Sequence, residues 1–448
     1  MKRFLLILSL ASLAATARCE TTAYPSLKPG DTSGWGRNIQ RTMRLLATCT
    51  PEHRNTVRIL FYGQSITEQK WAQFVTEDLR TRFPNADLVI ENRALAGFAS
   101  QMLVKTAETD LYPFQPDLLI FYVYGAHDKY EDIILRTRER TTAEILMQND
   151  HVTKSEAFTE ETDPAKLWPP DGKRWDAFMN HRWLPMLQKK YGTELCDQRA
   201  LWKVYLKENN LEPKALLRDG VHLNPHGEFL MAECVKAYLR YDPKLGPSPA
   251  EQWVKEYEVG KDGRLEFEGS RVDVIAKPGE KLGVKIDGKK PSEIPALYGF
   301  SRAKPKPGGK WPPVAPIKSE KPLVLEDWTM DVTKTGEKLF DFTVAGSKTG
   351  PDGSGRSDQK FVSDSGRVVI EPDAWNVDFA MSVLAGVKPI PAKFTVTWNV
   401  VPHFADEATG GTVTVANGLP NTKHVLELTA PATVRVYTPP LKGSGDVR

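Results

Sequence analysis

Five short apolar runs alternate with helix-like segments in the first half of the chain, and this alternation restricts the fold more than any other feature. The runs cover residues 57–62, 86–92, 118–124, 143–149 and 193–196. The segments between them carry apolar residues at helical spacing. Such alternation predicts a parallel sheet with helices on both faces. The runs are apolar almost throughout, which is typical of strands that are buried on both sides.

The first run ends at Gly63, and Ser65 follows shortly before a helical period that starts at about Thr67. Ligands bind at the carboxyl ends of strands in open α/β sheets. The N–H groups at a helix start can also stabilise an oxyanion. Ser65 is therefore a candidate nucleophile, with a helix-capping serine as the alternative.

A second candidate loop contains Asp219 and His222. Asn224 is a good N-cap, so both residues are expected just before a helix. At this spacing a carboxylate can accept a hydrogen bond from one imidazole nitrogen and leave the other free to act as a base. An Asp-Gly turn with a surface histidine is the alternative. In combination with Ser65, the loop is typical of a serine hydrolase.

Three further loops follow predicted strands. Gly97 lies after the second run and could present its backbone N–H, and His127 lies after the third. Asp150 and His151 follow the fourth run, either lining the crevice or forming a satisfied loop pair. Because all these loops come from carboxyl ends of parallel strands, we expect them to converge on one crevice.

These segments resemble the SGNH hydrolases, also called the GDSL-like esterase superfamily. The matching blocks, in chain order, are Gly63-Gln64-Ser65 for the Gly-Asp-Ser turn, Gly97 for the glycine donor, Gly125-Ala126-His127-Asp128 for Gly-x-Asn-Asp, and Asp219 with His222 for Asp-x-x-His. The resemblance covers roughly residues 56–240.

The resemblance implies a flavodoxin-like sheet of about five parallel strands and assigns roles to the candidate residues. Ser65 would be the nucleophile, His222 the general base and then acid, and Asp219 the residue that orients the imidazole. The oxyanion donors would be the N–H groups of Ser65 and Gly97 and a side chain of the third block. No metal and no cofactor are implied.

Two positions depart from the family pattern. Gln64 replaces the usual aspartate, and His127 replaces the usual asparagine. A neutral imidazole can donate one hydrogen bond, so His127 is the expected third oxyanion donor, with an ordinary loop residue as the alternative. Loss of one such donor typically costs ~3 kcal/mol in the transition state.

The second half of the chain has a different character. Prolines at 243, 247 and 249 mark a linker, and many short strands with Gly/Pro turns follow. This pattern predicts an all-β, jelly-roll-like sandwich. The predicted division is a signal peptide at 1–17, a hydrolase domain at 18–245 and an accessory β-sandwich domain at 246–448.

Lys2 and Arg3 precede an apolar run at 4–15 and a small-x-small cleavage site at 15–17. These are the marks of a signal peptide, so we expect a secreted or periplasmic protein without a membrane span after cleavage. The net charge of +3 gives no argument for a nucleic-acid partner. The sequence leaves open the oligomeric state and the pairing of four cysteines, namely Cys19, Cys49, Cys196 and Cys234.

The predicted function is that of a serine esterase that removes small acyl groups, chiefly acetyl, from polysaccharides or oligosaccharides. A lipid or simple-ester hydrolase with the same chemistry is one alternative. A non-catalytic glycan-binding protein on a hydrolase scaffold is the other, and His127 in place of asparagine prompts it.

Overall fold

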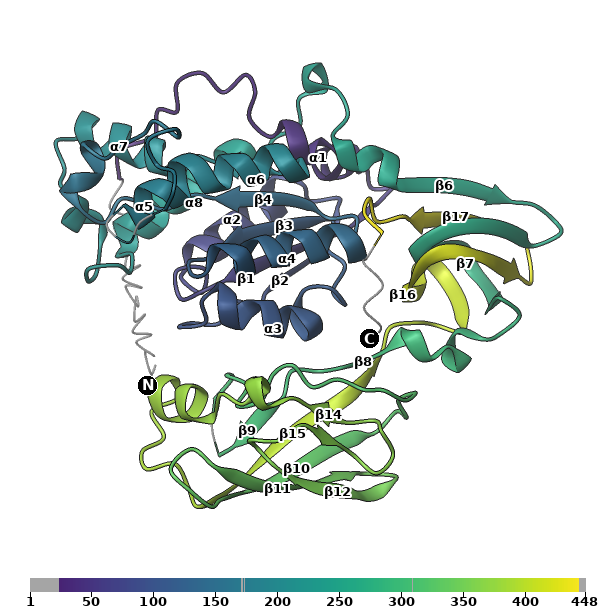
Figure 1. Ribbon diagram of the computed structural model, residues 1–448. Coiled ribbons are helices and arrows are strands. Elements are labelled where there is room, and N and C mark those ends of the chain that lie inside the picture. Colours follow the sequence, from purple (N-terminus) through teal and green to yellow (C-terminus); the bar gives the residue numbers. More distant parts are fainter. Residues whose placement is uncertain (1–23, 171, 173, 308, 443–448) are drawn as a thin grey trace, which may run out of the picture.

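The computed structural model describes residues 24–170, 172, 174–307 and 309–442. The predicted signal peptide and Cys19 lie outside these residues. Figure 1 shows three parts: an α/β part, a small β-sheet beside it, and a larger β-rich part that lies next to helix α3.

The α/β part is built on a parallel sheet with the order β2-β1-β3-β4-β5. All neighbouring strands in it are parallel. The strands are β1 (Thr56–Gly63), β2 (Asp87–Asn92), β3 (Leu118–Tyr122), β4 (Glu144–Gln148) and β5 (Glu194–Cys196). This is the flavodoxin-like strand order, and it confirms the predicted fold class.

Helices cover both faces of this sheet, as the alternation predicted (Figure 1). On one face Ile59 and Phe61 of β1 pack with α1, α2, α7 and α8, and on the other Leu60 and Tyr62 pack with α3, α4 and α6. The helices are α1 (Gln40–Ala47), α2 (Trp71–Arg82), α3 (Ser100–Asp110), α4 (His127–Arg140), α5 (Trp175–Phe178), α6 (Leu184–Tyr191), α7 (Gln198–Glu208) and α8 (Pro225–Tyr238). Because successive side chains of a strand point to opposite faces, one apolar strand serves two cores.

The chain runs from β1 to β2 on one side and then crosses to β3 on the other, so the strand order reverses at the carboxyl end of β1. Ligands bind at this switch point in sheets of this kind. Ser65 lies two residues beyond β1, at that position.

The predicted helix start at Thr67 is wrong, because α2 begins only at Trp71. The N–H groups of Thr67 and Glu68 both donate to the carbonyl of Gln64, at 2.9 and 3.3 Å. These bonds close tight turns after Ser65 and delay the helix. Ser65 therefore lies on a turn and not at a helix N-terminus.

The β-rich remainder contains two sets of sheets with separate cores. The small sheet has the order β16-β7-β17-β6, from β6 (Val254–Val259), β7 (Arg264–Ile286), β16 (Glu407–Leu428) and β17 (Ala432–Tyr437). The larger sheet has the order β12-β11-β10-β15-β8 with β9 against β15, and β13 (Phe361–Val362) pairs with β14 (Val369–Ile370). Its strands are β8 (Tyr298–Phe300), β9 (Lys304–Lys306), β10 (Asp327–Lys334), β11 (Phe340–Gly346), β12 (Gly350–Arg356) and β15 (Lys393–Pro402).

The larger β-part is therefore inserted between β7 and β16 of the small sheet. Antiparallel sheets after the parallel sheet confirm the predicted class of this region. The region has two separate cores, and β17 of the small sheet pairs with β6 and β7 from far back in the chain. The predicted domain boundary at 245/246 stays a prediction.

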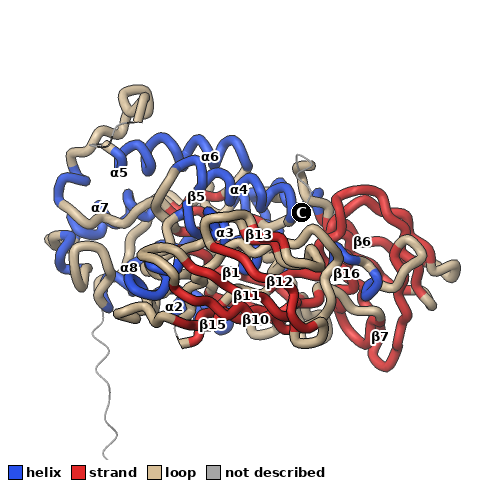
Figure 2. The backbone as a smooth tube through the Cα atoms, turned by 60° about the horizontal axis from the view of Figure 1, so that its bottom comes forward, coloured by secondary structure: helices blue, strands red, loops and turns tan. Residues whose placement is uncertain are grey.

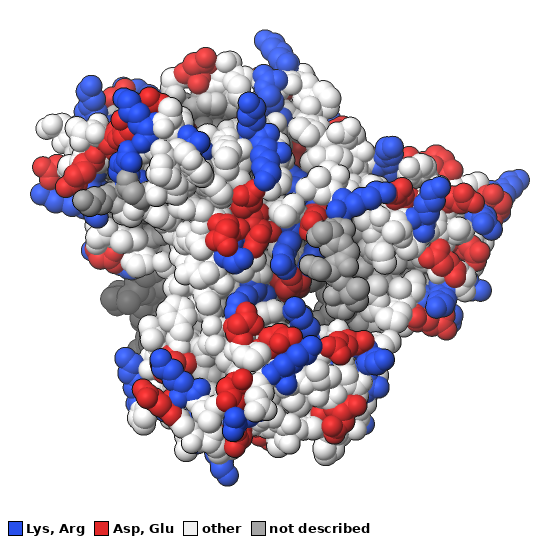
Figure 3. All heavy atoms as spheres, in the orientation of Figure 1, with Lys and Arg blue, Asp and Glu red and all other residues white. Residues whose placement is uncertain are grey.

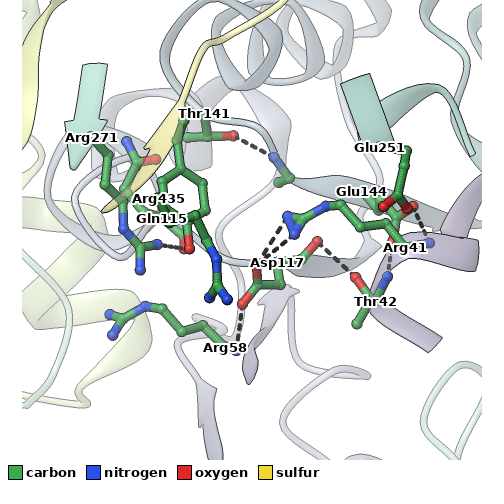
Figure 4. Close-up of polar contacts among 12 residues, drawn as sticks. Arg41, Thr42, Arg58, Gln115, Asp117, Thr141, Glu144, Glu251, Arg271 and Arg435 are labelled. Carbon is green, nitrogen blue, oxygen red and sulfur yellow. Dashed lines mark hydrogen bonds and ion pairs between the residues drawn. The ribbon is translucent and has the colours of Figure 1, made fainter. Parts of the chain in front are cut away.

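A buried polar network joins the small sheet to the α/β part (Figure 4). Arg41 of α1 contacts Asp117 through both terminal nitrogens, at 3.1 and 3.0 Å, and the Arg58 N–H donates to the same carboxylate. Arg271 of β7 donates to the Gln115 carbonyl at 3.3 Å. Asp117 immediately precedes β3, so the network lies at the amino ends of the strands. It leaves their carboxyl ends to the candidate site.

The long helices all belong to the α/β part (Figure 2). On the face shown in Figure 3, basic and acidic side chains are interspersed. None of the helices in the described residues is both long and apolar enough to cross a bilayer. Cys49, Cys196 and Cys234 are free thiols.

Candidate active site

Three of the predicted site residues meet at the carboxyl end of β1. The Oγ of Ser65 lies 3.0 Å from Nε2 of His222, although the two residues are 157 positions apart in the sequence. The other ring nitrogen of His222, Nδ1, lies 2.9 Å from Oδ2 of Asp219. An ionised carboxylate only accepts hydrogen bonds, so Nδ1 carries the proton and Nε2 is free to accept from the serine hydroxyl.

Asp219 is held in the ionised form by its own loop. The backbone N–H groups of His222 and Val221 donate to Oδ1 at 2.8 and 2.9 Å. These bonds, the one from His222 foremost, lower the pKa of Asp219 well below its ordinary value. The loop thus keeps a negative charge beside the imidazole at neutral pH.

Gln69 fixes the position of this loop relative to the Ser65 turn. Its side-chain carbonyl accepts from the Leu223 N–H at 3.0 Å, and its amide donates to the Leu223 carbonyl at 2.9 Å. Leu223 follows His222 directly. No local pattern in the sequence marks Gln69, because its partner is a backbone group of a distant loop.

Gln64 has a similar linking role. Its side-chain carbonyl accepts from the N–H of Tyr124 at 2.9 Å. The Ser65 turn is thereby fixed to the loop that follows β3. An aspartate in its place has a shorter side chain, so the departure from the family pattern has a structural use here.

The loop of Gly97 is also tied to the end of β1. The Leu95 N–H donates to the Gly63 carbonyl at 2.9 Å, and the Ala96 N–H donates to Oε1 of Glu68 at 2.7 Å. Gly97 has a φ of 77°, a conformation that favours glycine. Among the hydrogen bonds of the described residues, the N–H groups of Ser65 and Gly97 have no acceptor, which leaves both available to a ligand.

His127 is the first residue of α4, and its ring lies among three aromatic side chains. The ring centroids of Trp175, Phe178 and Trp183 lie 5.2, 4.9 and 5.4 Å away. Burial lowers the pKa of His127, and its Nε2 is buried with no hydrogen-bond partner in the part of the chain described. No contact among these residues joins His127 to Ser65, so its role as an oxyanion donor stays a prediction.

Asp150 and His151 form a satisfied, buried pair that also reaches the loop of Asp219 and His222. The hydroxyl of Tyr122 lies 2.8 Å from both Asp150 Oδ1 and His151 Nδ1. His151 Nε2 lies 2.8 Å from the Val221 carbonyl. A carbonyl only accepts, so Nε2 carries the proton of the neutral ring.

Asp150 is the acceptor in this cluster. The hydroxyl of Tyr122 donates to its Oδ1 at 2.8 Å, and Arg199 lies 3.6 Å from its Oδ2. Burial raises the pKa of Asp150 to about 7, although the nearby Arg199 opposes the shift. Through His151, this cluster contacts the backbone between Asp219 and His222.

No model of a known protein family matches the chain, and no curated protein matches it. Among solved structures, a GDSL-like lipase from Parabacteroides merdae is similar, at 20% identity and a TM-score of 0.34, over 42% of this chain and 98% of that chain. The acetylxylan esterase Axe2 from Geobacillus stearothermophilus shares 16% identity at a TM-score of 0.34, over 42% of this chain and 95% of its own. LAE5, an α/β hydrolase enzyme from the metagenome of Lake Arreo, Spain, shares 16% identity at a TM-score of 0.33, over 41% of this chain and 94% of its own.

Proposed function

We propose that this chain is a serine ester hydrolase of the SGNH type that releases acetyl groups from carbohydrate. One observation carries the proposal: Ser65 Oγ lies 3.0 Å from His222 Nε2, while Nδ1 of the same ring lies 2.9 Å from Asp219. Nucleophile, base and orienting carboxylate within hydrogen-bond reach are what covalent ester hydrolysis requires.

In the first step Ser65 Oγ attacks the ester carbonyl carbon while its proton passes to His222 Nε2. The resulting tetrahedral intermediate carries a negative oxygen. Collapse breaks the bond to the alcohol oxygen, which takes the proton from His222 and leaves. Asp219 stabilises the transient imidazolium, because its carboxylate stays ionised.

In the second step water replaces the alcohol. His222 takes a proton from water, the hydroxide attacks the acyl-Ser65 carbonyl, and Ser65 Oγ leaves with that proton. The sum is ester plus water giving acid plus alcohol. The proposed sequence uses only side chains and backbone of this chain, without a cofactor.

The proposed oxyanion donors are the N–H groups of Ser65 and Gly97, which have no acceptor within the described residues. His127 is proposed as a third donor through its neutral ring. A buried polar atom without a partner is costly, so the unpaired Nε2 of His127 supports a role with a ligand. The surrounding aromatic rings make it the weakest member of the set.

The exposure of the His222 and Asp219 side chains favours a substrate with a bulky alcohol group. The side chains of His222 and Asp219 are 31% and 47% exposed, and Val221 between them is 51% exposed. A triad at an open edge accepts a small acyl group on a bulky alcohol, as in an acetylated polysaccharide or oligosaccharide. Similarity to a protein described as an acetylxylan esterase agrees with this choice, and export to the periplasm or medium would place the enzyme with such polymers.

Hydrolysis of 4-nitrophenyl acetate and 4-nitrophenyl decanoate tests the reaction, and acetate release from acetylated xylan, pectin and oligosaccharides tests the substrate. We expect acetyl esters to be preferred and Ser65→Ala to lower the rate at least about 10³-fold. Ser33→Ala, at an exposed turn, is the matched control and should keep wild-type activity. Faster cleavage of decanoate without acetate release from any polymer would indicate a lipid or simple-ester hydrolase. Equal rates for wild type and Ser65→Ala would contradict the catalytic proposal and favour a glycan-binding protein.

A further inference from the structure

We propose that the larger β-part positions the loop of Gly97 and is thereby a working part of the esterase site, not an independent glycan-binding module. This inference rests on the proposed function, since it concerns the proposed oxyanion donor. Three side chains of the β-part, Trp311, Phe379 and Leu384, pack against the hydrophobic core beneath helices α3, α4 and α6. Figure 1 shows the β-part lying against α3, the helix into which the Gly97 loop leads.

The decisive contact is made by Trp311. Its indole N–H donates to the carbonyl of Ala96 at 2.8 Å. That carbonyl and the N–H of Gly97 belong to one peptide group, which is planar and trans, so the two point in opposite directions. Holding the Ala96 carbonyl therefore fixes the direction of the Gly97 N–H. A hydrogen bond to the carbonyl also polarises the peptide and strengthens its N–H as a donor.

Two further residues restrain the preceding peptide. The Ala96 N–H donates to Glu68 Oε1 at 2.7 Å, and Lys310 of the β-part pairs with the same oxygen. The Lys310 ammonium lies 5.3 Å from the centroid of the neighbouring Trp311 ring. Lys310 thus restrains the Ala96 N–H through Glu68, and Trp311 restrains the Ala96 carbonyl directly.

Leu384 covers the other side of the glycine. A Cβ built on Gly97 would lie 2.4 Å from Cδ2 of Leu384, so a side chain at this position would require Leu384 to move. Leu384 ends the π-helical turn Asp378–Leu384, and Phe379 of the same turn stacks on Phe98 with centroids 6.0 Å apart. The β-part therefore packs directly against the Gly97 loop through Leu384 and Phe379.

The test compares Trp311→Phe in the full chain with a matched control. Phenylalanine keeps an aromatic ring and removes the N–H that holds Ala96. Trp375→Phe is the control, because Trp375 is also a partly buried tryptophan of the β-part and its indole N–H has no partner among the described residues. Loss of a direct oxyanion donor costs about 10²–10³ in kcat, so we expect loss of its orienting bond to lower kcat about tenfold with KM within about twofold.

Two additional readouts separate positioning from general stability. The rate of covalent inactivation by diethyl 4-nitrophenyl phosphate should fall with kcat, because the phosphoryl oxygen uses the same donors. The Tm of Trp311→Phe should match that of Trp375→Phe. Lys310→Gln, at a partly exposed position, should show a smaller loss in kcat of about threefold and serves if Trp311→Phe does not fold.

Each outcome either supports or contradicts the positioning role of the β-part. If Trp311→Phe and Lys310→Gln keep the kcat of Trp375→Phe while Ser65→Ala is inactive, the positioning role is wrong and the esterase proposal stands. If wild type shows no Ser65-dependent hydrolysis, the proposed function fails and this inference fails with it. A fall in kcat and in inactivation rate at constant Tm supports the positioning role.

Discussion

Gln69 forms two hydrogen bonds with the backbone of Leu223, one as acceptor at 3.0 Å and one as donor at 2.9 Å. The Gln69 side chain thus bonds to both backbone groups of Leu223, as a neighbouring β-strand would. The Ser65 turn and the His222 loop are joined at this point, and the distance between the proposed nucleophile and the proposed base depends on it.

Replacement of Gln69 by alanine should therefore loosen the Ser65–His222 contact. A small misplacement of reacting groups can cost up to about 10²-fold in rate, so we expect kcat to fall about ten- to hundredfold with little change in KM. Steady-state kinetics with 4-nitrophenyl acetate measures this. Gln73→Ala is the matched control, because Gln73 lies exposed on α2, four residues after Gln69, and its side-chain hydrogen bond within the described residues is to Glu77. Equal kcat in both variants would show that Gln69 does not set the geometry.

Asp219→Asn should lower kcat by about 10³–10⁴-fold, because the amide no longer fixes the imidazole tautomer or stabilises the imidazolium. The bonds from the His222 and Val221 N–H groups lower the pKa of Asp219. A lowered pKa means that the carboxylate stays ionised as the pH falls. Asp219 itself should therefore add no titration step between pH 8 and pH 5 to the wild-type pH–rate profile. A loss of kcat below tenfold in Asp219→Asn would contradict the orienting role, and Asp31→Asn at a remote exposed turn should match wild type throughout.

The α/β part could be predicted because its signals are local. Strand β1 supplies both cores, so its residues are apolar in succession, and that run is visible in the sequence. Asp219 and His222 are three residues apart, so their contact follows from the loop alone. The contact of Ser65 with His222 was inferred from loop convergence and from the family resemblance.

Other features leave no local signal. The start of α2 depends on turns closed by the Gln64 carbonyl, and Gln64 has no capping signature. The division of the β-region depends on β17 pairing with β6, more than 170 residues earlier. Trp311 contacts Ala96 across 215 positions, and its sequence neighbours do not distinguish it from a core tryptophan. Such contacts are properties of the packed chain.

Gly97→Ala should be costly for two separable reasons. The φ of 77° strains any residue with a Cβ, at about 1 kcal/mol. The new methyl would also meet Leu384. We expect kcat/KM to fall about 100-fold in Gly97→Ala. In the double variant with Leu384→Ala, kcat/KM should be about tenfold higher than in Gly97→Ala, because space is restored while the backbone strain remains.

The matched control for this cycle is Gly30→Ala. Gly30 has a similar φ of 74°, but a Cβ there would meet nothing within 4 Å. It should lose about 1 kcal/mol of unfolding free energy and keep full activity. If Leu384→Ala gives no recovery in the Gly97→Ala background, contact with Leu384 is not what makes glycine necessary.

His151 should make the protein sensitive to mild acid. Burial lowers the pKa of His151 to about 4, whereas a free imidazole titrates near about 6.5. Between these values the unfolded chain binds a proton at His151 that the folded chain does not, so the contribution of His151 to the free energy of unfolding falls as the pH drops from about 6.5 to about 4. The difference in pKa corresponds to roughly 3 kcal/mol at full titration. The raised pKa of Asp150 acts with the opposite sign, because the folded chain there binds a proton that the unfolded chain does not.

Glutamine at position 151 can donate to the Val221 carbonyl and keep a polar group beside the Tyr122 hydroxyl, but it does not titrate. Urea unfolding of wild type and His151→Gln at pH 7.5 and pH 4.5 should therefore show a smaller acid-induced loss in the variant. Carboxylates remote from position 151 are common to both proteins and cancel in the comparison. The same measurement in the Asp150→Asn background removes the adjacent carboxyl that titrates in this window. His53→Gln, at an exposed loop, should follow wild type. An identical pH dependence in wild type and His151→Gln would mean that the buried imidazole does not control acid stability, and the coupling of this pair to the loop of Asp219 and His222 would then have to be sought in kcat alone.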